Sequence, residues 1–211
     1  MKKYFTNKNF LIWDFDGVIK ESLEAKTIAF KKLFIPFGEK IVSKVIEHHQ
    51  SNGGVSRYSK IPLYLNWANV ENDGKTIEQF CQSFSDLVKQ AVIESPWVPG
   101  VLETLNYNYK KKHIFLLTAT PQKEIEFILK NLGIYNFFKK IVGHPTNKSI
   151  ALKSLIEEYS IRTSQAIFIG DSKTDLEAAQ NFGVQFLLRK TKINQSLQKL
   201  YNGPQIDNFL E

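Results

Sequence analysis

Cysteine is almost missing from this 211-residue chain, in which Cys81 is the only one. A disulfide within the chain is therefore excluded, which fits a reducing compartment. No histidine lies near Cys81 in the sequence, so we interpret it as a small buried helix residue and not as a nucleophile.

Long apolar runs are missing as well. No segment is apolar for long enough to cross a bilayer, and the short run LIW at residues 11–13 is followed at once by acids. We therefore expect an intracellular, cytoplasmic protein with no membrane partner.

The chain also lacks zinc-ligand spacing, an RNP-type aromatic motif, internal repeats and low-complexity tracts. Its formal net charge is +7, but the lysines are scattered apart from small clusters at 110–112 and 139–140. The charge alone fits either nucleic acid or a small anionic substrate. Without a recognition motif, no nucleic-acid partner is expected.

What the chain does have is an alternation of strand-like and helical segments. Strand-like runs lie at 9–13, 113–118, 137–142, 166–170 and 184–188, and helical patterns lie at 122–131, 149–159 and 174–182. Alternating strands and helices are typical of a parallel sheet with right-handed crossovers. The pattern predicts an α/β fold with a Rossmann-like core.

Residues 20–95 break that alternation. Helical patterns cover 21–34, 39–50, 56–70 and 76–93, and no convincing strand separates them. Pro96 and Pro99-Gly100 mark the return to the alternating pattern. We expect a core formed by 1–19 and 96–211, with an all-helical insert at 20–95.

Polar residues gather where the predicted strands end, and ligands of open parallel sheets bind at that edge. The residues concerned are Asp14, Asp16, Thr118, Ala119, Lys148, Asp171 and Asp175. So many acids would repel one another unless a cation lies among them, and Mg²⁺ prefers such oxygen ligands. A bound phosphate would meet a lysine, a hydroxyl and backbone N–H groups. The edge therefore suggests magnesium-assisted phosphoryl transfer.

Each of these residues, taken singly, also has an ordinary structural explanation. Asp171 could cap a helix, Asp175 could interact with a helix dipole, Lys148 could be solvated, and Thr118 could simply end a strand. The pair Asp14 and Asp16 is the hardest to explain structurally.

The motifs D-F-D-G-V (14–18), L-L-T (116–118), Lys148 and G-D-S-x-x-D-L-x-A-A (170–179) occur in this order along nearly the whole chain. They resemble the four motifs of the haloacid dehalogenase-like hydrolases, in particular the phosphoglycolate phosphatase and β-phosphoglucomutase-like subgroup. The resemblance implies a Rossmann-like parallel sheet with an inserted all-helical cap, in agreement with the pattern above.

The resemblance also implies roles. Asp14 would be the nucleophile that forms an aspartyl-phosphate, and Asp16 the general acid and base. Asp14, the Asp16 carbonyl and Asp171 would hold Mg²⁺, with Asp175 orienting or joining them. Thr118, the Ala119 N–H and Lys148 would hold the phosphoryl oxygens and offset their charge. Dehalogenating members lack an acid two positions after the nucleophile, so Asp16 favours phosphate chemistry.

The insert carries a string, Gly54-Val55-Ser56-Arg57, that looks like the cap loop of the β-phosphoglucomutases. Gly54 and Arg57 are therefore candidate substrate-binding residues, although Arg57 could equally be an exposed arginine behind a Ser56 N-cap. Those mutases have a histidine ten positions after the second aspartate, where this chain has Lys26. That difference favours hydrolysis over mutase activity.

Further candidates for the pocket lining are Lys26, Tyr58 and Lys60. Of the four histidines, His144 is expected to come nearest to the pocket, and His48 and His49 are interpreted as surface or packing residues.

These observations predict a Mg²⁺-dependent phosphatase for a small phosphorylated metabolite, a sugar phosphate or a phosphoglycolate-like acid. The alternatives are a sugar phosphomutase and a catalytically silent binding protein on the same scaffold. A monomer or a homodimer is expected.

Overall fold

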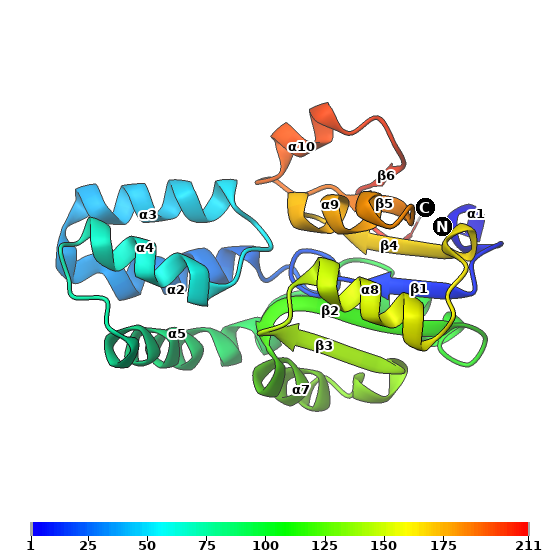
Figure 1. Ribbon diagram of the computed structural model, residues 1–211, viewed down its shortest axis with the longest axis horizontal. Coiled ribbons are helices and arrows are strands. Elements are labelled where there is room, and N and C mark those ends of the chain that lie inside the picture. Colours follow the sequence, from blue (N-terminus) through cyan, green and yellow to red (C-terminus); the bar gives the residue numbers. More distant parts are fainter. Residues whose placement is uncertain (1, 211) are drawn as a thin grey trace.

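The computed structural model describes residues 2–210 of the chain, which form a parallel sheet with helices on both faces and a helical layer beyond one end (Figure 1). The sheet order is β3-β2-β1-β4-β5-β6. The strands are β1 (Phe10–Trp13), β2 (His113–Pro121), β3 (Lys140–His144), β4 (Ala166–Gly170), β5 (Gln185–Arg189) and β6 (Gln205–Ile206). The predicted α/β fold is confirmed.

Strand β1 is central because it pairs in parallel with β2 on one side and with β4 on the other. Its side chains alternate between the two faces, as the strand period of two requires. Leu11 and Trp13 belong to one apolar cluster and Ile12 belongs to the other. Burial on both faces explains why the strand is an uninterrupted apolar run in the sequence.

Helices cover both faces of the sheet. Apolar residues of α6 (Val101–Asn108) and α7 (Gln122–Asn131) share a cluster with Leu11 and Trp13. Those of α8 (Lys148–Glu158) and α9 (Lys173–Asn181) share the other cluster with Ile12. Two short helices add to these clusters: Phe5 of α1 (Lys2–Phe5) belongs to the first, and Leu197 of α10 (Gln195–Leu200) packs against the second.

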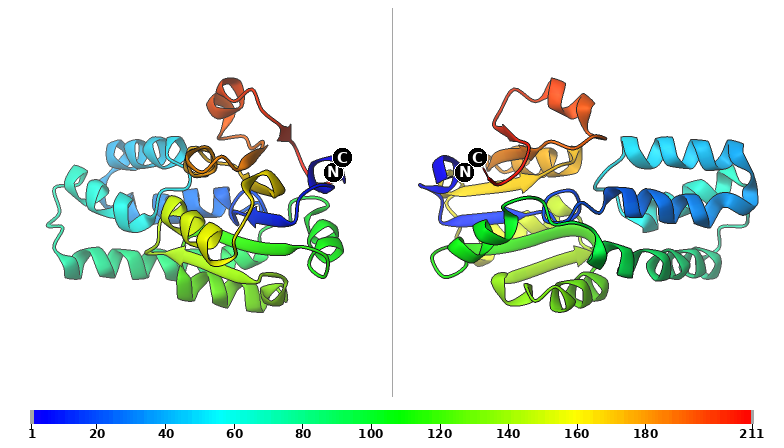
Figure 2. Two further views of the ribbon diagram at one scale, coloured as in Figure 1. Left: turned by 45° about the vertical axis from the view of Figure 1, so that its right-hand side comes forward. Right: turned by 180° about the vertical axis from the view of Figure 1, so that it is seen from behind.

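Four helices between β1 and α6 form a separate layer, called the cap below. They are α2 (Leu23–Phe34), α3 (Glu39–Ser51), α4 (Arg57–Trp67) and α5 (Gly74–Glu94). Aromatic contacts of Phe30 with Tyr64 and Phe84 join α2, α4 and α5. Figures 1 and 2 show that this layer lies beyond the carboxyl ends of the strands. The cap therefore stands over the edge where ligands bind in such sheets.

The structure corrects several predicted elements. The strand expected at 137–142 begins at Lys140, because Tyr135–Phe137 form a 3₁₀ turn before it. Helices α1, α6 and α10 and strand β6 were not predicted. They are short, and strand β6 has only two residues, so their apolar periodicity is too brief to detect. The exact division at residues 20 and 95 stays a prediction.

Cys81 is buried in α5, as expected, and burial raises the pKa of its thiol to about 11. Among residues 2–210, every helix is too short or too polar to cross a bilayer. The cytoplasmic location stays a prediction.

Candidate active site

Three neighbouring strands bring the polar residues of the predicted edge together. Asp14 directly follows β1, and its N–H donates to the Ile169 carbonyl of β4 at 2.9 Å. Asp171 directly follows β4, and Thr118 lies near the end of β2. Because β1 pairs with both β2 and β4, the three side chains meet at one edge of the sheet.

A cluster of three buried carboxylates lies at this edge. Asp14, Asp171 and Asp175 each offer an oxygen within 4.8 Å of the others. Lys148, at the start of α8, lies 2.7 Å from Asp14 Oδ2 and 2.6 Å from Asp175 Oδ1. One lysine therefore faces three acids.

The excess of negative charge shifts the pKa values of the cluster. Burial, together with the charges of Asp175 and Asp16, raises the pKa of Asp14 to about 7 despite Lys148. Burial and the neighbouring Asp14 and Asp175 raise the pKa of Asp171 well above its usual range. Burial alone would lower the pKa of Lys148, but Asp14 and Asp175 outweigh it and raise that pKa. Lys148 is therefore held as a cation, but its single positive charge does not neutralise the three acids.

The donor set fits a divalent cation with a preference for oxygen, such as Mg²⁺. Asp171 has no ion pair with any residue in 2–210, although its carboxyl is buried. Gly17 approaches it so closely that a Cβ there would lie 2.5 Å from Asp171 Oδ2, and the backbone of Gly17 has φ +74°. Only glycine fits that position without strain, which leaves room for the Asp171 carboxylate.

Asp175 is completely buried and is held in one orientation. Its Oδ2 accepts from the Ser172 N–H at 3.0 Å, as part of the capping box of α9, and it also accepts from Ser172 Oγ at 2.5 Å. The other oxygen faces Lys148, and Asp175 does not line the cavity described below. This arrangement suits an orienting group.

Asp16 lies in a different electrostatic environment from Asp14. It forms an ion pair with Lys26 and accepts from Ser22 Oγ at 2.6 Å and from Thr120 Oγ1 at 3.2 Å. Burial would raise the pKa of Asp16, but Lys26 and the two hydroxyls outweigh it and lower that pKa. The two acids that are adjacent in the motif therefore differ in their affinity for a proton.

The end of β2 departs from regular pairing. The register between β2 and β3 shifts between Leu117 and Pro121, which interrupts the ladder at Thr118, Ala119 and Thr120. Thr118 and Thr120 are both buried, and Ala119 lies between them at the cavity wall. A hydroxyl and interrupted backbone next to Asp14 suit the binding of an anion.

A cavity of about 60 Å³ separates this edge from the cap. Ligand sites usually measure about 300–1,000 Å³, so the cap lies close against the edge. Its wall includes Asp14, Asp16, Lys26, Phe30, His49, Gly54, Arg57, Lys60, Phe84, Thr118, Ala119, Thr120, Lys148, Asp171 and Ile193. Gly54 has φ +78°, and a Cβ there would lie 2.1 Å from Thr174 Oγ1, so this loop position requires glycine.

Arg57 lies in the cavity wall but has a protein partner that the sequence did not suggest. Its two terminal nitrogens bind both carboxylate oxygens of Glu124 on α7, and Nη1 donates to Ser85 Oγ at 2.6 Å. Arg57 is buried, so the alternative of an exposed arginine is wrong. Its role toward a substrate stays a prediction. In this structure its guanidinium joins the cap to the core.

The structure reverses the expectation for the histidines. His144 is absent from the wall of this cavity and instead stacks on Tyr58, with ring centroids 4.5 Å apart. Tyr58 is likewise outside the wall, whereas Lys26 and Lys60 line it. His49 is buried and packs on the Phe30 ring with centroids 4.7 Å apart, which agrees with its interpretation as a packing residue, but it also lines the cavity, which was not expected.

Several further residues at the site were missed from the sequence. Ser22 and Thr120 hydrogen-bond Asp16, Glu124 holds Arg57, and Ile193 lines the cavity. Thr120 had a detectable signal, because it lies two positions after Thr118 and strand residues two apart share a face. Glu124 had none, since an acid in a first helical turn is usually explained by the helix dipole.

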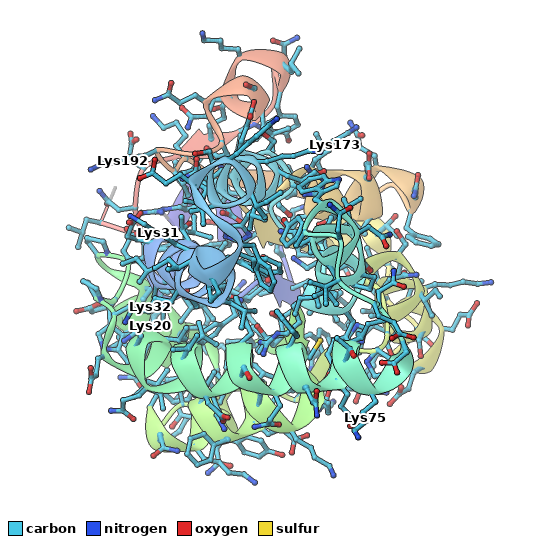
Figure 3. The ribbon with its side chains drawn as sticks, turned by 90° about the vertical axis from the view of Figure 1, so that its left-hand side faces the viewer. Lys20, Lys31, Lys32, Lys75, Lys173 and Lys192 are labelled. Atoms are coloured by element: carbon cyan, nitrogen blue, oxygen red, sulfur yellow. The ribbon has the colours of Figure 1, made fainter. Side chains whose placement is uncertain are left out.

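Figure 3 looks onto the cap end of the molecule. Lys31 and Lys32 of α2 lie close to Lys20 on one side of this view, whereas Lys75 of α5 and Lys173 of α9 lie on the other side. The absence of a nucleic-acid partner stays a prediction.

Comparisons with known proteins agree with the geometry. The family described as haloacid dehalogenase-like hydrolase matches residues 11–188. A phosphoglycolate phosphatase of Pseudomonas putida is 24% identical over 181 residues, covering 83% of this chain and 66% of that protein. The chain thus spans slightly less than two thirds of that relative's length.

Two solved structures share the fold. A β-phosphoglucomutase from Clostridium difficile superposes with a TM-score of 0.76 at 20% identity, covering 97% of this chain and 93% of that one. CbbY from Rhodobacter sphaeroides, in complex with phosphate, gives a TM-score of 0.77 at 15% identity, covering 97% and 96%. At these identities the likeness establishes the fold alone.

Proposed function

The chain belongs to the haloacid dehalogenase-like hydrolases, and from that premise we propose that it is a Mg²⁺-dependent phosphatase of a small phosphorylated metabolite. The observation that carries the proposal is the buried group of Asp14, Asp171 and Asp175 around Lys148, with Asp16 beside it. Structural ion pairs rarely leave three buried acids with one lysine.

Asp14 is the proposed nucleophile. Its carboxylate oxygen attacks phosphorus, the ester P–O bond breaks, and an aspartyl-phosphate forms. The Phe15 N–H donates to Asp14 Oδ1 at 2.7 Å, which leaves Oδ2 on the side of Lys148. The fixed carboxylate favours attack by avoiding the entropic cost of orienting it.

Asp16 is the proposed general acid and base. It gives a proton to the leaving oxygen, then removes one from the water that attacks phosphorus and releases phosphate, which regenerates Asp14. Ser22, Thr120 and Lys26 hold the carboxylate in place. The lowered pKa of Asp16 keeps its carboxylate ionised, which is the form that accepts a proton in the second step.

Asp14, the Asp16 carbonyl and Asp171 are the proposed Mg²⁺ ligands, with Asp175 orienting Lys148. A bound Mg²⁺ would supply positive charge that lets a phosphate dianion approach the carboxylates. Lys148, the Thr118 hydroxyl and the Ala119 N–H are proposed to hold the phosphoryl oxygens.

Hydrolysis is favoured over phosphoryl transfer to a sugar by the residue at position 26. The ammonium group of Lys26 pairs with Asp16 and also donates to Thr120 Oγ1 at 3.1 Å. A neutral histidine at this place could exchange a proton with Asp16, but a lysine ammonium can only donate. The names of the relatives suggest a phosphoglycolate-like acid or a sugar phosphate as the substrate.

The cap at 20–95 is proposed to exclude water and to select the substrate, over a core formed by 1–19 and 96–211. The cavity wall draws on both parts, since Lys26, Gly54 and Arg57 come from the cap and Asp14, Thr118 and Lys148 from the core.

A phosphatase assay over sugar phosphates, phospho-acids and a generic aryl phosphate, with Mg²⁺ or with EDTA, tests this function. Release of inorganic phosphate that requires Mg²⁺ is expected. Conversion of a hexose 1-phosphate to its isomer would instead indicate the mutase. No turnover of any ester by folded protein, as seen by circular dichroism, would support the silent binding protein.

A further inference from the structure

Four cationic side chains line the cavity, and three of them have carboxylate partners. Lys148 pairs with Asp14 and Asp175, Lys26 with Asp16, and Arg57 with Glu124. Lys60, on α4 in the cap, has no carboxylate partner among the described residues, although it is only 2% exposed. It is the one unpaired cation of the described cavity wall.

The surroundings of Lys60 are poorly suited to a charge. Its ammonium lies 3.1 Å from His49 Nδ1 and 3.4 Å from the His49 carbonyl, and the Phe30 ring centre is 6.0 Å away. Burial, and secondarily the charge of Lys26, lower the pKa of Lys60 to about 7. A lysine in such a place destabilises the fold, so packing does not explain it.

His49 provides a second, independent feature. It is 7% exposed and lines the same cavity, and its Nε2 has no hydrogen-bond partner in residues 2–210. Burial and the positive charges of Lys60 and Lys26 keep the ring neutral, with a pKa lowered to about 2. When charged Lys60 donates to Nδ1, the ring proton lies on Nε2. The histidine then offers a second buried donor without an acceptor.

We propose that Lys60 and His49 form a binding site for a second anionic group of the substrate, a carboxylate or a second phosphate remote from the transferred phosphoryl. The inference rests on the proposed function and narrows its substrate class. Two buried donors without an acid between them are complementary to anionic oxygens, and they face the sheet edge across a small cavity. The substrate would thus bring its scissile phosphate to Asp14 and its other anion to the cap.

Matched substrate pairs test this site. One pair is 2-phosphoglycolate and 2-hydroxyethyl phosphate, which differ in a carboxylate. The other is glucose 1,6-bisphosphate and glucose 1-phosphate, which differ in a phosphate. The wild type should prefer the anionic member of one pair by about 10- to 100-fold in kcat/KM, and the pair that shows it identifies the anion.

Lys60→Met should reduce that preference to less than about threefold, mainly through KM, and Lys60→Arg should restore part of it. His49→Phe should reduce it by a smaller factor, because it removes only the neutral donor. Lys40→Met, at an exposed position of α3, is the matched control and should retain the wild-type preference. Equal kcat/KM values within both wild-type pairs would overturn the proposal, and so would a preference that survives in Lys60→Met.

A binding measurement separates this site from the proposed activity. Titration calorimetry on Asp14→Asn protein needs no turnover, and it should show tighter binding of the anionic member that Lys60→Met abolishes. If no ester is hydrolysed but this difference is found, the phosphatase fails and the anion site stands. If esters are hydrolysed and no difference is found, the anion site fails alone.

Discussion

The two walls of the cavity have opposite imbalances of charge. On the sheet edge, Asp14, Asp171 and Asp175 face Lys148 alone. On the cap, Arg57 and Lys60 line the cavity, and no carboxylate of the cap pairs with either of them. Glu124, which binds Arg57, comes from the core. Each wall therefore lacks what the other has in excess, although Lys26 of the cap pairs with Asp16 of the edge and Arg57 of the cap pairs with Glu124 of the core.

The comparison shows what a ligand must provide. The edge requires an added cation, and the cap requires an added anion. A Mg²⁺ ion together with a phosphate ester that carries a second negative group supplies both. The charged groups of both walls are desolvated without enough opposite charge, which lowers the stability of the ligand-free protein. Binding of a ligand should therefore raise the free energy of unfolding.

The largest effect is expected from the edge. Asp14→Asn should lower kcat by about 10⁴-fold or more, because the amide cannot act as the nucleophile. Asp86→Asn, at an exposed position of α5 in the cap, should leave turnover of an aryl phosphate at the wild-type level. Steady-state assays with Mg²⁺ decide this, and residual activity of Asp14→Asn above about a hundredth of wild type would contradict it.

When no metal is present, Asp14→Asn should be more stable than the wild type. The pKa of Asp14 is raised by burial to about 7, so ionising it destabilises the fold progressively as the pH rises from about 4 to 7. In EDTA, Asp14→Asn should therefore raise Tm at pH 8 and have less effect at pH 4.5. An equal change in Tm at both pH values would show that the negative charge of Asp14 does not destabilise the fold.

Metal removal should act next most strongly. EDTA should lower turnover by about 10²–10³-fold, and Mg²⁺ should raise the Tm of the wild type because it binds the folded cluster only. Asp171→Asn should abolish this shift in Tm in a differential scanning measurement. A shift of wild-type size in Asp171→Asn would place the metal elsewhere.

An intermediate effect is expected where the two walls meet, at Lys26 and Asp16. Lys26→Met should lower kcat by roughly 10- to 100-fold, because Asp16 loses the partner that holds it and lowers its pKa. Lys26→Arg should recover part of the loss. Unchanged kcat in Lys26→Met would show that Ser22 and Thr120 position the acid without help from the cap.

The smallest effect is expected from the cap wall and concerns stability. The pKa of Lys60 is lowered by burial to about 7. The charge of Lys60 therefore destabilises the fold fully below pH 7, and this destabilisation disappears as the pH rises toward the pKa of lysine in the unfolded chain, near 10. Lys60→Met should raise Tm by several degrees at pH 6, since about 1 kcal/mol corresponds to 2–4 °C in a chain of this size. The gain should be smaller at pH 9, and a lower Tm at pH 6 would contradict the account.

The sequence was informative about the edge and much less so about the cap. Asp14, Asp171 and Thr118 could be placed together because parallel strands bring their carboxyl ends to one edge whatever the side-chain packing. The pairing of Arg57 with Glu124 and the site of Lys60 and His49 depend on how four helices pack against each other and on the core. A helical pattern in the sequence indicates which face of a helix is buried, but not which element packs against that face. These contacts could therefore not be predicted.

The nucleophilic role of Asp14 can be tested most directly by trapping the intermediate. An Asp16→Asn variant with Mg²⁺ and an acyl phosphate is quenched in acid, reduced with borohydride and analysed by peptide mass spectrometry. The account predicts homoserine at position 14 and none after omission of Mg²⁺. Homoserine at another aspartate, or at no aspartate while phosphate is released, would contradict it.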